Sequence, residues 1–423
     1  MKKSSLIGHT IEVYDAIVQQ SYPADSVINS FFRSHKYLGS RDRRFIAETT
    51  YGMLRYKKKL EWILSFTNHS STKHLCFLYL TMFSQEKFLE DEISENLQQE
   101  FHQAVTKSTV VLSKEKSITK ISLEYSFPEW IIEEWISSFG EEETKKLCEV
   151  INTPPPLTLR VNTIKCSVEE CQQALLSEGI TTERTQYSPF GLILKKRINV
   201  FQLSAFNNGF FEVQDEGSQL LPLLIDPKPT AKIIDACAGA GGKTLELSAL
   251  MKNRGTIYAL DIHSRRLEEL RKRIRRSGAD NIRVMTIEEE KISSELIGTA
   301  DAVLIDSPCS GTGTLRRNPG MKWTVVPSMI DELNAKQQNI LELYSQCVKP
   351  NGIVVYATCS LLRQENENVV EQFLSTHPNF VVEDFSAKLE RYNIYLSPKK
   401  YFQLFPHIHN TDGFFAVVMR KVA

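Results

Sequence analysis

The segment from Lys232 to Thr244 has the sequence KIIDACAGAGGKT. Its apolar first residues predict a buried strand, its glycines predict a loop, and a helix is expected from Lys243 onward. Glycines allow the backbone to approach a ligand closely, and the first turn of a helix offers free N–H groups. The spacing of Gly239, Gly241 and Gly242 differs from the dinucleotide fingerprint, and the P-loop has a glycine where Cys237 stands. The segment therefore predicts a nucleoside-type cofactor site and disfavours a NAD enzyme.

The pattern of strand, loop and helix repeats from about residue 214 to the end of the chain. We expect strands at residues 232–235, 256–261, 282–285, 302–306 and 353–357. We expect helices between and after them at residues 243–251, 264–276, 329–348 and 364–375. Such alternation predicts an α/β domain with a parallel, doubly wound, Rossmann-like sheet. A last strand is expected at residues 413–419.

The remaining residues predict two further domains, because 423 residues exceed what one hydrophobic core usually holds. Residues 1–120 have apolar positions at helical spacing and few prolines or glycines, which predicts an all-α domain. Residues 107–121 are rich in Ser, Thr and Lys and are expected to form a linker. Residues 121–213 mix helical and strand-like stretches, which predicts a small α+β adaptor for the substrate. Residues 214–423 make up the sheet domain.

Composition excludes several classes of protein. No apolar run approaches the roughly 20 residues of a membrane span, and the first residues lack the apolar core of a signal peptide. The eight cysteines are scattered without a Cys-x-x-Cys pair, which argues against a zinc site and fits a reducing cytoplasm. The formal net charge is zero, so total charge gives no support for nucleic-acid binding.

Basic residues nevertheless gather in three places. The clusters are Arg33, Lys36, Arg41, Arg43 and Arg44; Arg55, Lys57, Lys58 and Lys59; and Arg265, Arg266, Arg271, Lys272, Arg273, Arg275 and Arg276. Each cluster could be a solvated helix face, which is the commoner situation for any one of them. Together they could hold the phosphate backbone of a nucleic acid.

Two cysteines follow predicted strands in short, polar motifs. Cys309 lies in Asp306-Ser307-Pro308-Cys309-Ser310-Gly311-Thr312-Gly313, and Cys359 lies in Tyr356-Ala357-Thr358-Cys359-Ser360. Both thiols should emerge at the carboxyl edge of the sheet, beside the cofactor loop. Cysteine is often a small buried hydrophobe, and that interpretation suits Cys76, Cys148 and Cys347 in their helical patterns. The loop-forming neighbours of Cys309 and Cys359 favour a chemical role instead.

The strand ends also supply carboxylates. Asp306 is aimed at the same edge as the thiols, although it could instead form a turn. Asp261 could accept hydrogen bonds from a ribose diol, or it could cap the helix expected at Ser264. A helix expected from about Arg363 would lower the pKa of the Cys359 thiol, both through its N-terminus and through the arginine.

Two thiols and a carboxylate beside a nucleoside cofactor suit methylation of cytosine at carbon 5. A thiolate that adds at carbon 6 makes carbon 5 nucleophilic, and a carboxyl group near ring nitrogen 3 assists the addition. A second group must then remove the carbon 5 proton so that the thiol can leave. The residues alone leave open which thiol attacks.

At these motifs the chain resembles the RNA 5-methylcytosine methyltransferases of the Sun/Fmu (RsmB-like) family. The resemblance rests on the two cysteine motifs, on Arg316-Arg317-Asn318-Pro319, on Glu365-Asn366-Glu367, on Leu159-Arg160-Val161-Asn162, on Gln214-Asp215-Glu216 and on Asp412-Gly413-Phe414-Phe415. It implies a NusB-like fold for residues 1–120 and an RNA-binding role for residues 1–120 and 121–213. It further implies that Cys359 is the nucleophile and that Cys309 assists release of the enzyme.

The resemblance also implies S-adenosylmethionine as cofactor. The implied contacts are Cys237, Ala238, Gly239, Ala240, Gly241, Gly242, Lys243, Asp261 at the ribose, Glu288 at the adenosine end, and Asp306. The family loop usually has a proline where Ala240 stands. The run from Glu288 to Glu290 leaves open which glutamate takes the acidic role.

The sequence thus predicts a methyltransferase that acts on RNA, with small-subunit ribosomal RNA as the expected substrate. We expect a cytoplasmic monomer that uses neither metal nor membrane. The alternatives are the same chemistry on transfer RNA, or a non-catalytic RNA-binding factor of ribosome assembly that retains the fold.

Overall fold

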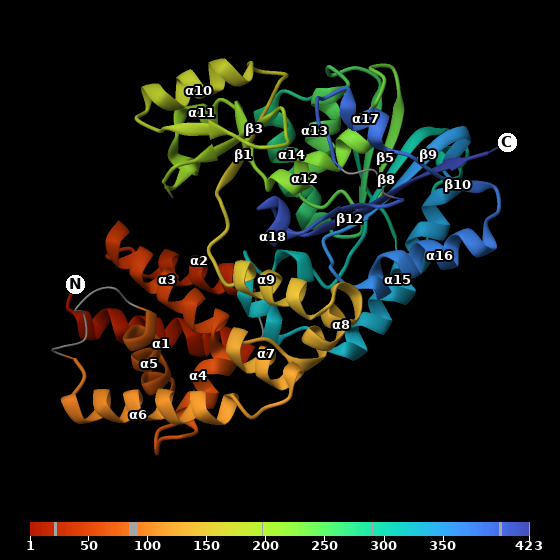
Figure 1. The fold of residues 1–423 in the computed structure, drawn as a ribbon. Coiled ribbons are helices and arrows are strands. Elements are labelled where there is room, and N and C mark those ends of the chain that lie inside the picture. Colours follow the sequence, from red (N-terminus) through yellow and green to blue (C-terminus); the bar gives the residue numbers. More distant parts are fainter. Residues whose placement is uncertain (21–22, 84–91, 197, 289–290, 397–399, 423) are drawn as a thin grey trace. The chain divides into compact units, whose positions relative to one another are not determined.

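The computed structural model describes residues 1–20, 23–83, 92–196, 198–288, 291–396 and 400–422 (Figure 1). The chain divides into two compact units, one of Met1–Pro154 with Leu315–Pro327 and one of Pro155–Thr314 with Ser328–Ala423. Within the described ranges, no helix combines the length and the apolar character that crossing a bilayer requires.

The first unit is all-α, as the sequence predicts for its N-terminal part. Its helices are α1 (Lys3–Gln20), α2 (Ala24–Ser34), α3 (Ser40–Arg55), α4 (Lys57–Leu64), α5 (Thr72–Phe83), α6 (Glu95–Leu112), α7 (Ser117–Tyr125), α8 (Glu129–Phe139) and α9 (Glu141–Ile151). Their apolar faces enclose a core that includes Ile46, Met53, Leu60 and Phe101. Such amphipathic helices bury one face and leave the other polar.

The prediction of a linker at residues 107–121 is wrong, because α6 and α7 cover most of this stretch. Its Ser and Thr hydroxyls donate to carbonyls one turn earlier, as Thr109 Oγ1 does to the Val105 oxygen at 2.9 Å. Hydroxyl groups satisfied in this way are compatible with a helix. The compact units divide at Pro154, whereas the sequence predicts a domain boundary near residue 121. The three domains 1–120, 121–213 and 214–423 stay a prediction.

Residues 315–327 lie in the first unit although they are far from it in sequence. They contain the 3-10 helix η5 (Pro319–Trp323) and place Lys322 in the interior, with none of its side chain exposed. The Lys322 ammonium donates to the carbonyls of Arg55 and Ser126, both at 3.2 Å, and to Asn152 Oδ1 at 2.7 Å. It also lies 3.5 Å from the ring centroid of Phe127. A buried cation needs such partners, so Lys322 ties this segment to three helical elements.

The second unit contains the large sheet. Its strands are β5 (Lys232–Asp235), β6 (Thr256–Asp261), β7 (Ile282–Thr286), β8 (Ala300–Asp306), β9 (Val348–Thr358), β10 (Phe380–Glu383), β11 (Phe402–Leu404) and β12 (Phe414–Lys421). Among described residues the order is β10-β12-β9-β8-β5-β6-β7, with β11 paired to β12. The strands from β9 to β7 in this order are parallel, and β10, β11 and β12 are antiparallel additions. The predicted α/β class is confirmed.

Helices cover both faces of this sheet (Figure 1). Successive residues of a strand point to opposite faces, so Ile233 enters one core and Ile234 the other. One core lies against α12 (Glu216–Leu220), α13 (Gly242–Leu250), α14 (Ser264–Ser277) and α17 (Ser386–Glu390). The other lies against α15 (Pro327–Ser345) and α16 (Glu367–Thr376). A sheet buried on both faces requires continuous apolar strands, which explains the runs seen in the sequence.

A smaller antiparallel sheet belongs to the same unit. Its strands are β1 (Thr158–Val161), β2 (Thr182–Arg184), β3 (Gly191–Leu194) and β4 (Phe211–Val213), in the order β2-β3-β1-β4. The elements beside it are α10 (Val168–Ser177) and α11 (Ser204–Asn207), with α18 (Pro406–His409) near the C-terminus of the chain. From β1, the buried Arg160 donates to the Gly242 carbonyl at 2.5 Å and to Glu246 Oε2 at 3.2 Å. The small sheet therefore supports the start of α13.

Lys322→Met should destabilise the first unit, because three buried oxygens lose their donor. We expect a loss of about 2–4 kcal/mol in the free energy of unfolding. All four tryptophans, Trp62, Trp130, Trp135 and Trp323, belong to the first unit, so their fluorescence during urea denaturation reports on it alone. Lys146→Met, on the exposed side of α9, is the control and should leave the transition unchanged. Equal midpoints for both variants would contradict the anchoring role of Lys322.

Candidate active site

The loop between β5 and α13 is held in shape by its own backbone. The Ala238 N–H donates to the Leu260 carbonyl at 2.9 Å, and the Gly241 N–H donates to the Ala238 carbonyl at 2.8 Å. Gly241 has a φ of +84°, and a Cβ there would lie 2.1 Å from Leu270 Cδ1. Glycine is favoured here because this φ is left-handed and because a Cβ would displace the Leu270 side chain of α14. Gly239 and Gly242 differ, since no atom lies within 4 Å of the place where their Cβ would be.

Asp261, at the end of β6, holds the other side of the loop. Its Oδ2 accepts from the Gly239 N–H at 2.8 Å, and its Oδ1 accepts from the His263 N–H at 2.7 Å. The carboxylate therefore braces the loop and the entry to α14, as a strand-end cap would. It also lines the cavity described next, where each oxygen retains a second lone pair. The cap is present, and the ribose role stays a prediction.

A cavity of about 1220 Å³ opens at the carboxyl ends of the strands. Most of the residues that the sequence assigns to cofactor and catalysis line it. They are Cys237, Ala238, Gly239, Ala240, Gly241, Gly242, Lys243, Asp261, Glu288, Asp306 and Cys309. The Glu288 carboxylate also pairs with the Lys291 ammonium, and Glu289 and Glu290 lie outside the described residues. Cys359 is not among the residues that line the cavity, but it lies against one that is.

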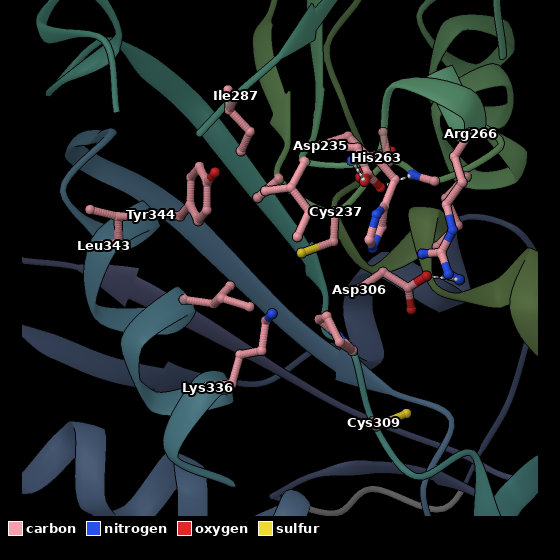
Figure 2. Close-up of a pocket in the computed structure, with 18 of the residues that line it drawn as sticks. Asp235, Cys237, His263, Arg266, Ile287, Asp306, Cys309, Lys336, Leu343 and Tyr344 are labelled. Carbon is pink, nitrogen blue, oxygen red and sulfur yellow. Dashed lines mark hydrogen bonds and ion pairs between the residues drawn. The ribbon is translucent and has the colours of Figure 1, made fainter. Parts of the chain in front are cut away.

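The opposite wall of the cavity comes from α15. Figure 2 shows Lys336, Leu343 and Tyr344 on this helix, across the cavity from Cys237 and Asp306. Burial, with smaller contributions from nearby acidic groups, raises the pKa of Tyr344, so this wall stays neutral there. The sequence pattern predicts this helix but does not mark any of these residues as part of the site. Their helical spacing shows that they share a face, whereas only the fold shows that the face meets the cofactor loop.

Three ionisable side chains, Asp235, Lys243 and Asp306, lie beside the cofactor loop. Burial raises the pKa of Asp235 to about 7, and its Oδ2 accepts from Thr244 Oγ1 at 2.6 Å. Lys243 Nζ lies 2.6 Å from Asp306 Oδ2. Burial, the largest single influence, would lower the pKa of Lys243. Attraction to Asp306, the hydrogen bond with it and smaller attractions to other nearby acidic groups together outweigh burial and raise this pKa. Lys243 is thus a permanent cation that fixes the Asp306 carboxylate at the strand end.

The two sulfur atoms predicted to act together are neighbours. Cys309 Sγ and Cys359 Sγ are 3.3 Å apart, although the residues are 50 positions apart in sequence. The hydrogen bond to the Cys359 thiol and burial both raise the pKa of the Cys309 thiol. Both influences favour the protonated form of Cys309. Cys76, Cys148 and Cys347 are buried, as expected for structural cysteines.

The helix expected from about Arg363 is present, but its α-helical part begins later. Residues Arg363–Glu365 form a single 3-10 turn, and α16 begins only at Glu367. The Arg363 side chain is exposed. A single 3-10 turn has few aligned peptide units, so it supplies little of the helix dipole that was expected to act on Cys359.

The second unit thus has a Rossmann-like sheet, a cavity at the carboxyl edge of that sheet and a glycine loop closed by the acidic end of the second strand. This arrangement defines the class of S-adenosylmethionine-dependent methyltransferases. The cavity fits the cofactor, because Gly239 and Gly242 leave room for a ligand against the loop and Asp261 offers acceptors beside it.

Comparison with known proteins gives the family. Residues 222–420 match the model described as 16S rRNA methyltransferase RsmB/F, and residues 127–201 match the ferredoxin-like domain of RsmF/B-like methyltransferases. A probable ribosomal RNA small subunit methyltransferase B of Bacillus subtilis (strain 168) is 30% identical over an alignment of 451 residues that covers 100% of both chains. Its namesake in Synechocystis is 37% identical over 309 residues, 71% of this chain and 69% of the relative.

Solved structures agree with this assignment. A methyltransferase homolog protein from Pyrococcus horikoshii has a TM-score of 0.62 at 27% identity, and the match covers 73% of this chain and 100% of that one. The chain therefore belongs to the RsmB/F family of ribosomal RNA methyltransferases. The resemblance found in the sequence, the methyltransferase class and the use of S-adenosylmethionine are confirmed.

Asp261→Asn should weaken cofactor binding by about 1–3 kcal/mol if the carboxylate accepts hydrogen bonds from the ribose. Because Asp261 also braces the loop, affinity alone does not separate the two roles. Titration calorimetry should therefore compare S-adenosylhomocysteine with its 2′-deoxy analogue on both proteins. Removal of the 2′-hydroxyl should reduce the binding affinity of the wild-type protein more than that of the variant. An equal penalty in both proteins would leave Asp261 as a structural cap, and Glu268→Gln on the exposed face of α14 serves as control.

Proposed function

We propose that this protein methylates carbon 5 of a cytosine in small-subunit ribosomal RNA through a covalent bond to Cys359. The observation that carries the proposal is the 3.3 Å separation of the Cys309 and Cys359 sulfur atoms at the edge of the cofactor cavity. Single-thiol catalysis would not need such a pair. The names of the relatives support ribosomal RNA as the substrate class.

Cys359 acts first in this proposal. Its thiolate accepts a hydrogen bond from the Cys309 thiol and adds to carbon 6 of the cytosine, which makes carbon 5 nucleophilic. Bound S-adenosylmethionine supplies an electrophilic methyl group. Cys309 releases its own proton to water and, as a thiolate, takes the carbon 5 proton. The electrons of that C–H bond re-form the carbon 5–carbon 6 double bond. The Cys359 sulfur departs with the electrons of its own bond.

Asp306 positions the base in this proposal. Its carboxylate lines the cavity and is fixed by the Lys243 ammonium at 2.6 Å. From there it can accept from the exocyclic amine of the cytosine, and from ring nitrogen 3 once that nitrogen has taken up a proton. That proton neutralises the negative charge that accumulates there when carbon 6 is attacked. The target base has to leave its stack to reach this depth.

The basic residues of α2, of the turn that follows it, of α3 and of α14 would hold the RNA backbone. Arg33, Lys36, Arg41 and Arg44 are exposed on the first unit, as are Arg265, Arg271, Lys272 and Arg275 on α14. Arg273 and Arg276 serve a structural purpose instead, since both pair with Glu212. Phosphate contacts of this kind position RNA without reading its sequence.

We further propose that the protein acts as a monomer in a reducing compartment such as the cytoplasm. Two sulfur atoms 3.3 Å apart must stay reduced if one of them is to attack the base. Transfer RNA is the alternative substrate, and methylation assays on both RNAs separate the two. A non-catalytic assembly factor is the other alternative, and it would form no covalent complex with RNA.

The two thiols should fail differently when replaced. Cys359→Ala should abolish methyl transfer and form no adduct, because the attacking group is gone. Cys309→Ala should attack, methylate once and stall, because removal of the carbon 5 proton is impaired. The measurement is denaturing electrophoresis with methyl-labelled cofactor, in which the stalled adduct carries the label.

Cys347→Ala, a buried thiol outside the cavity, is the control and should turn over normally. An adduct with Cys359→Ala and none with Cys309→Ala would reverse the two roles. If neither variant traps RNA while the control is active, covalent catalysis by this pair has no support.

Arg33→Gln combined with Arg41→Gln should flatten the dependence of log affinity on log salt by about one to two units. Each arginine that contacts a phosphate releases a counterion, so removing two lowers the slope without changing the methylated position. Equilibrium binding of RNA over a series of salt concentrations measures this. Lys145→Gln with Lys146→Gln removes the same charge from α9, where both lysines pair with glutamates, and should leave the slope unchanged. A slope equal to that of the wild type would show that Arg33 and Arg41 do not contact RNA and belong to a solvated helix face.

A further inference from the structure

Glu365 is a carboxylate in the interior of the second unit, with none of its side chain exposed. Four groups donate to its two oxygens. Oε1 accepts from the Ser310 N–H at 2.8 Å and from Gln337 Nε2 at 3.0 Å. Oε2 accepts from the hydroxyls of Ser310 and Ser360, both at 2.5 Å. All four donors are neutral, so hydrogen bonds alone solvate this buried charge.

The donors come from the places that matter for the two thiols. Ser310 directly follows Cys309, and Ser360 directly follows Cys359. Gln337 lies on α15, and its amide also donates to the Pro308 carbonyl at 2.9 Å, on the other side of Cys309. One carboxylate therefore joins the loop of each cysteine to the other and to a helix of the cavity wall.

Further contacts close the same network. Thr312 Oγ1 lies 3.1 Å from Ser360 Oγ and accepts from the Leu361 N–H at 2.9 Å. The Gly313 N–H donates to the Cys359 carbonyl at 2.8 Å. These hydrogen bonds connect the Cys309 loop to the Cys359 loop. Among the groups that form them, Glu365 is the only ionisable one. Its contacts leave the sulfur atoms themselves untouched.

A buried charge of this kind adds little to stability, because its desolvation costs about as much as its hydrogen bonds return. The geometry favours a different benefit, since four directional bonds specify where two loops from different strands come to rest. Its negative charge also contributes to the raised pKa of the Cys309 thiol, after the Cys359 hydrogen bond and burial.

We propose that Glu365 is a positioning residue that sets the separation of the Cys309 and Cys359 sulfur atoms. The sulfur atoms meet at 3.3 Å because the residues that follow them are bonded to one carboxylate. The catalytic consequence rests on the proposed function, whereas the spacing itself does not. Loss of the carboxylate should slow chemistry while leaving substrate and cofactor binding intact, because Glu365 lies outside the cavity lining.

The spacing can be measured without catalysis. Oxidised glutathione converts the two thiols into a Cys309–Cys359 disulfide, taking up two electrons and two protons to become two molecules of reduced glutathione. The equilibrium between the forms gives the effective concentration of one thiol at the other, which falls when the pair is no longer held together. Acid quenching and mass spectrometry of the linked peptides identify this disulfide among the other cysteines.

Glu365→Ala should lower this effective concentration by about tenfold or more. It should also lower kcat by about 10- to 100-fold with KM for RNA unchanged, as expected when reacting groups are misplaced by an ångström. Glu365→Gln should lie between Ala and wild type, because its amide oxygen can still accept from the Ser310 N–H. Ser310→Ala and Ser360→Ala each remove one hydroxyl that donates to Glu365. If Glu365→Ala does not fold, the effective concentration of the thiols in these two variants tests the proposal instead.

Glu367→Ala is the matched control. This carboxylate stands two residues further on, is half-buried and accepts from Gln403 Nε2 at 2.8 Å instead of from the cysteine loops. It should behave as wild type in both measurements. An unchanged disulfide equilibrium in folded Glu365 and serine variants would overturn the positioning role. A lowered equilibrium with unchanged kcat would support the spacing and overturn the joint action of the thiols in the proposed function.

Discussion

Parallel pairing of β8 with β9 brings the two reactive loops together, and the site depends on its register. Ile305 lies opposite Tyr356, and Asp306 lies opposite Ala357. Cys309 comes three residues after the end of β8, and Cys359 directly follows the end of β9, so the register places both at the same edge. A slip of one residue would turn every side chain of a strand to the other face and separate the thiols. The central position of both strands, buried on both faces, makes such a slip costly.

The cofactor side of the site depends on the neighbouring pair, β5 with β6. Asp235 ends one strand and Asp261 the other, and the loop from Cys237 is fixed between them. Because β5 also pairs with β8, the cofactor loop and the Cys309 loop emerge from adjacent strands. Lys243 then spans the gap to Asp306. In the proposed function, cofactor binding and base recognition thus share one ion pair, which links the two halves of the reaction in space.

The sequence predicts the repeated strand–loop–helix pattern, but it does not predict contacts that arise only from the packing of distant segments. The strands at residues 232–235 and 256–261 have the predicted bounds, because apolar runs between glycines and acidic residues mark strands buried on both faces. The meeting of Cys309 and Cys359 follows from the same reasoning, as both motifs directly follow strands. The linker at residues 107–121 was mistaken for a loop because Ser and Thr favour loops, although their hydroxyls here bond within helices.

Lys322 and Glu365 could not be found from the sequence for a shared physical reason. A lone Lys or Glu in a polar stretch is normally solvated. Its charged group can be buried only when several acceptors or donors from distant segments surround it. Lys322 collects oxygens from residues 55, 126 and 152, and Glu365 collects donors from residues 310, 337 and 360. Convergence of this kind is a property of the fold and not of any local pattern. Both groups therefore favour the native packing over alternatives, because all their hydrogen bonds form only when the distant segments are packed together.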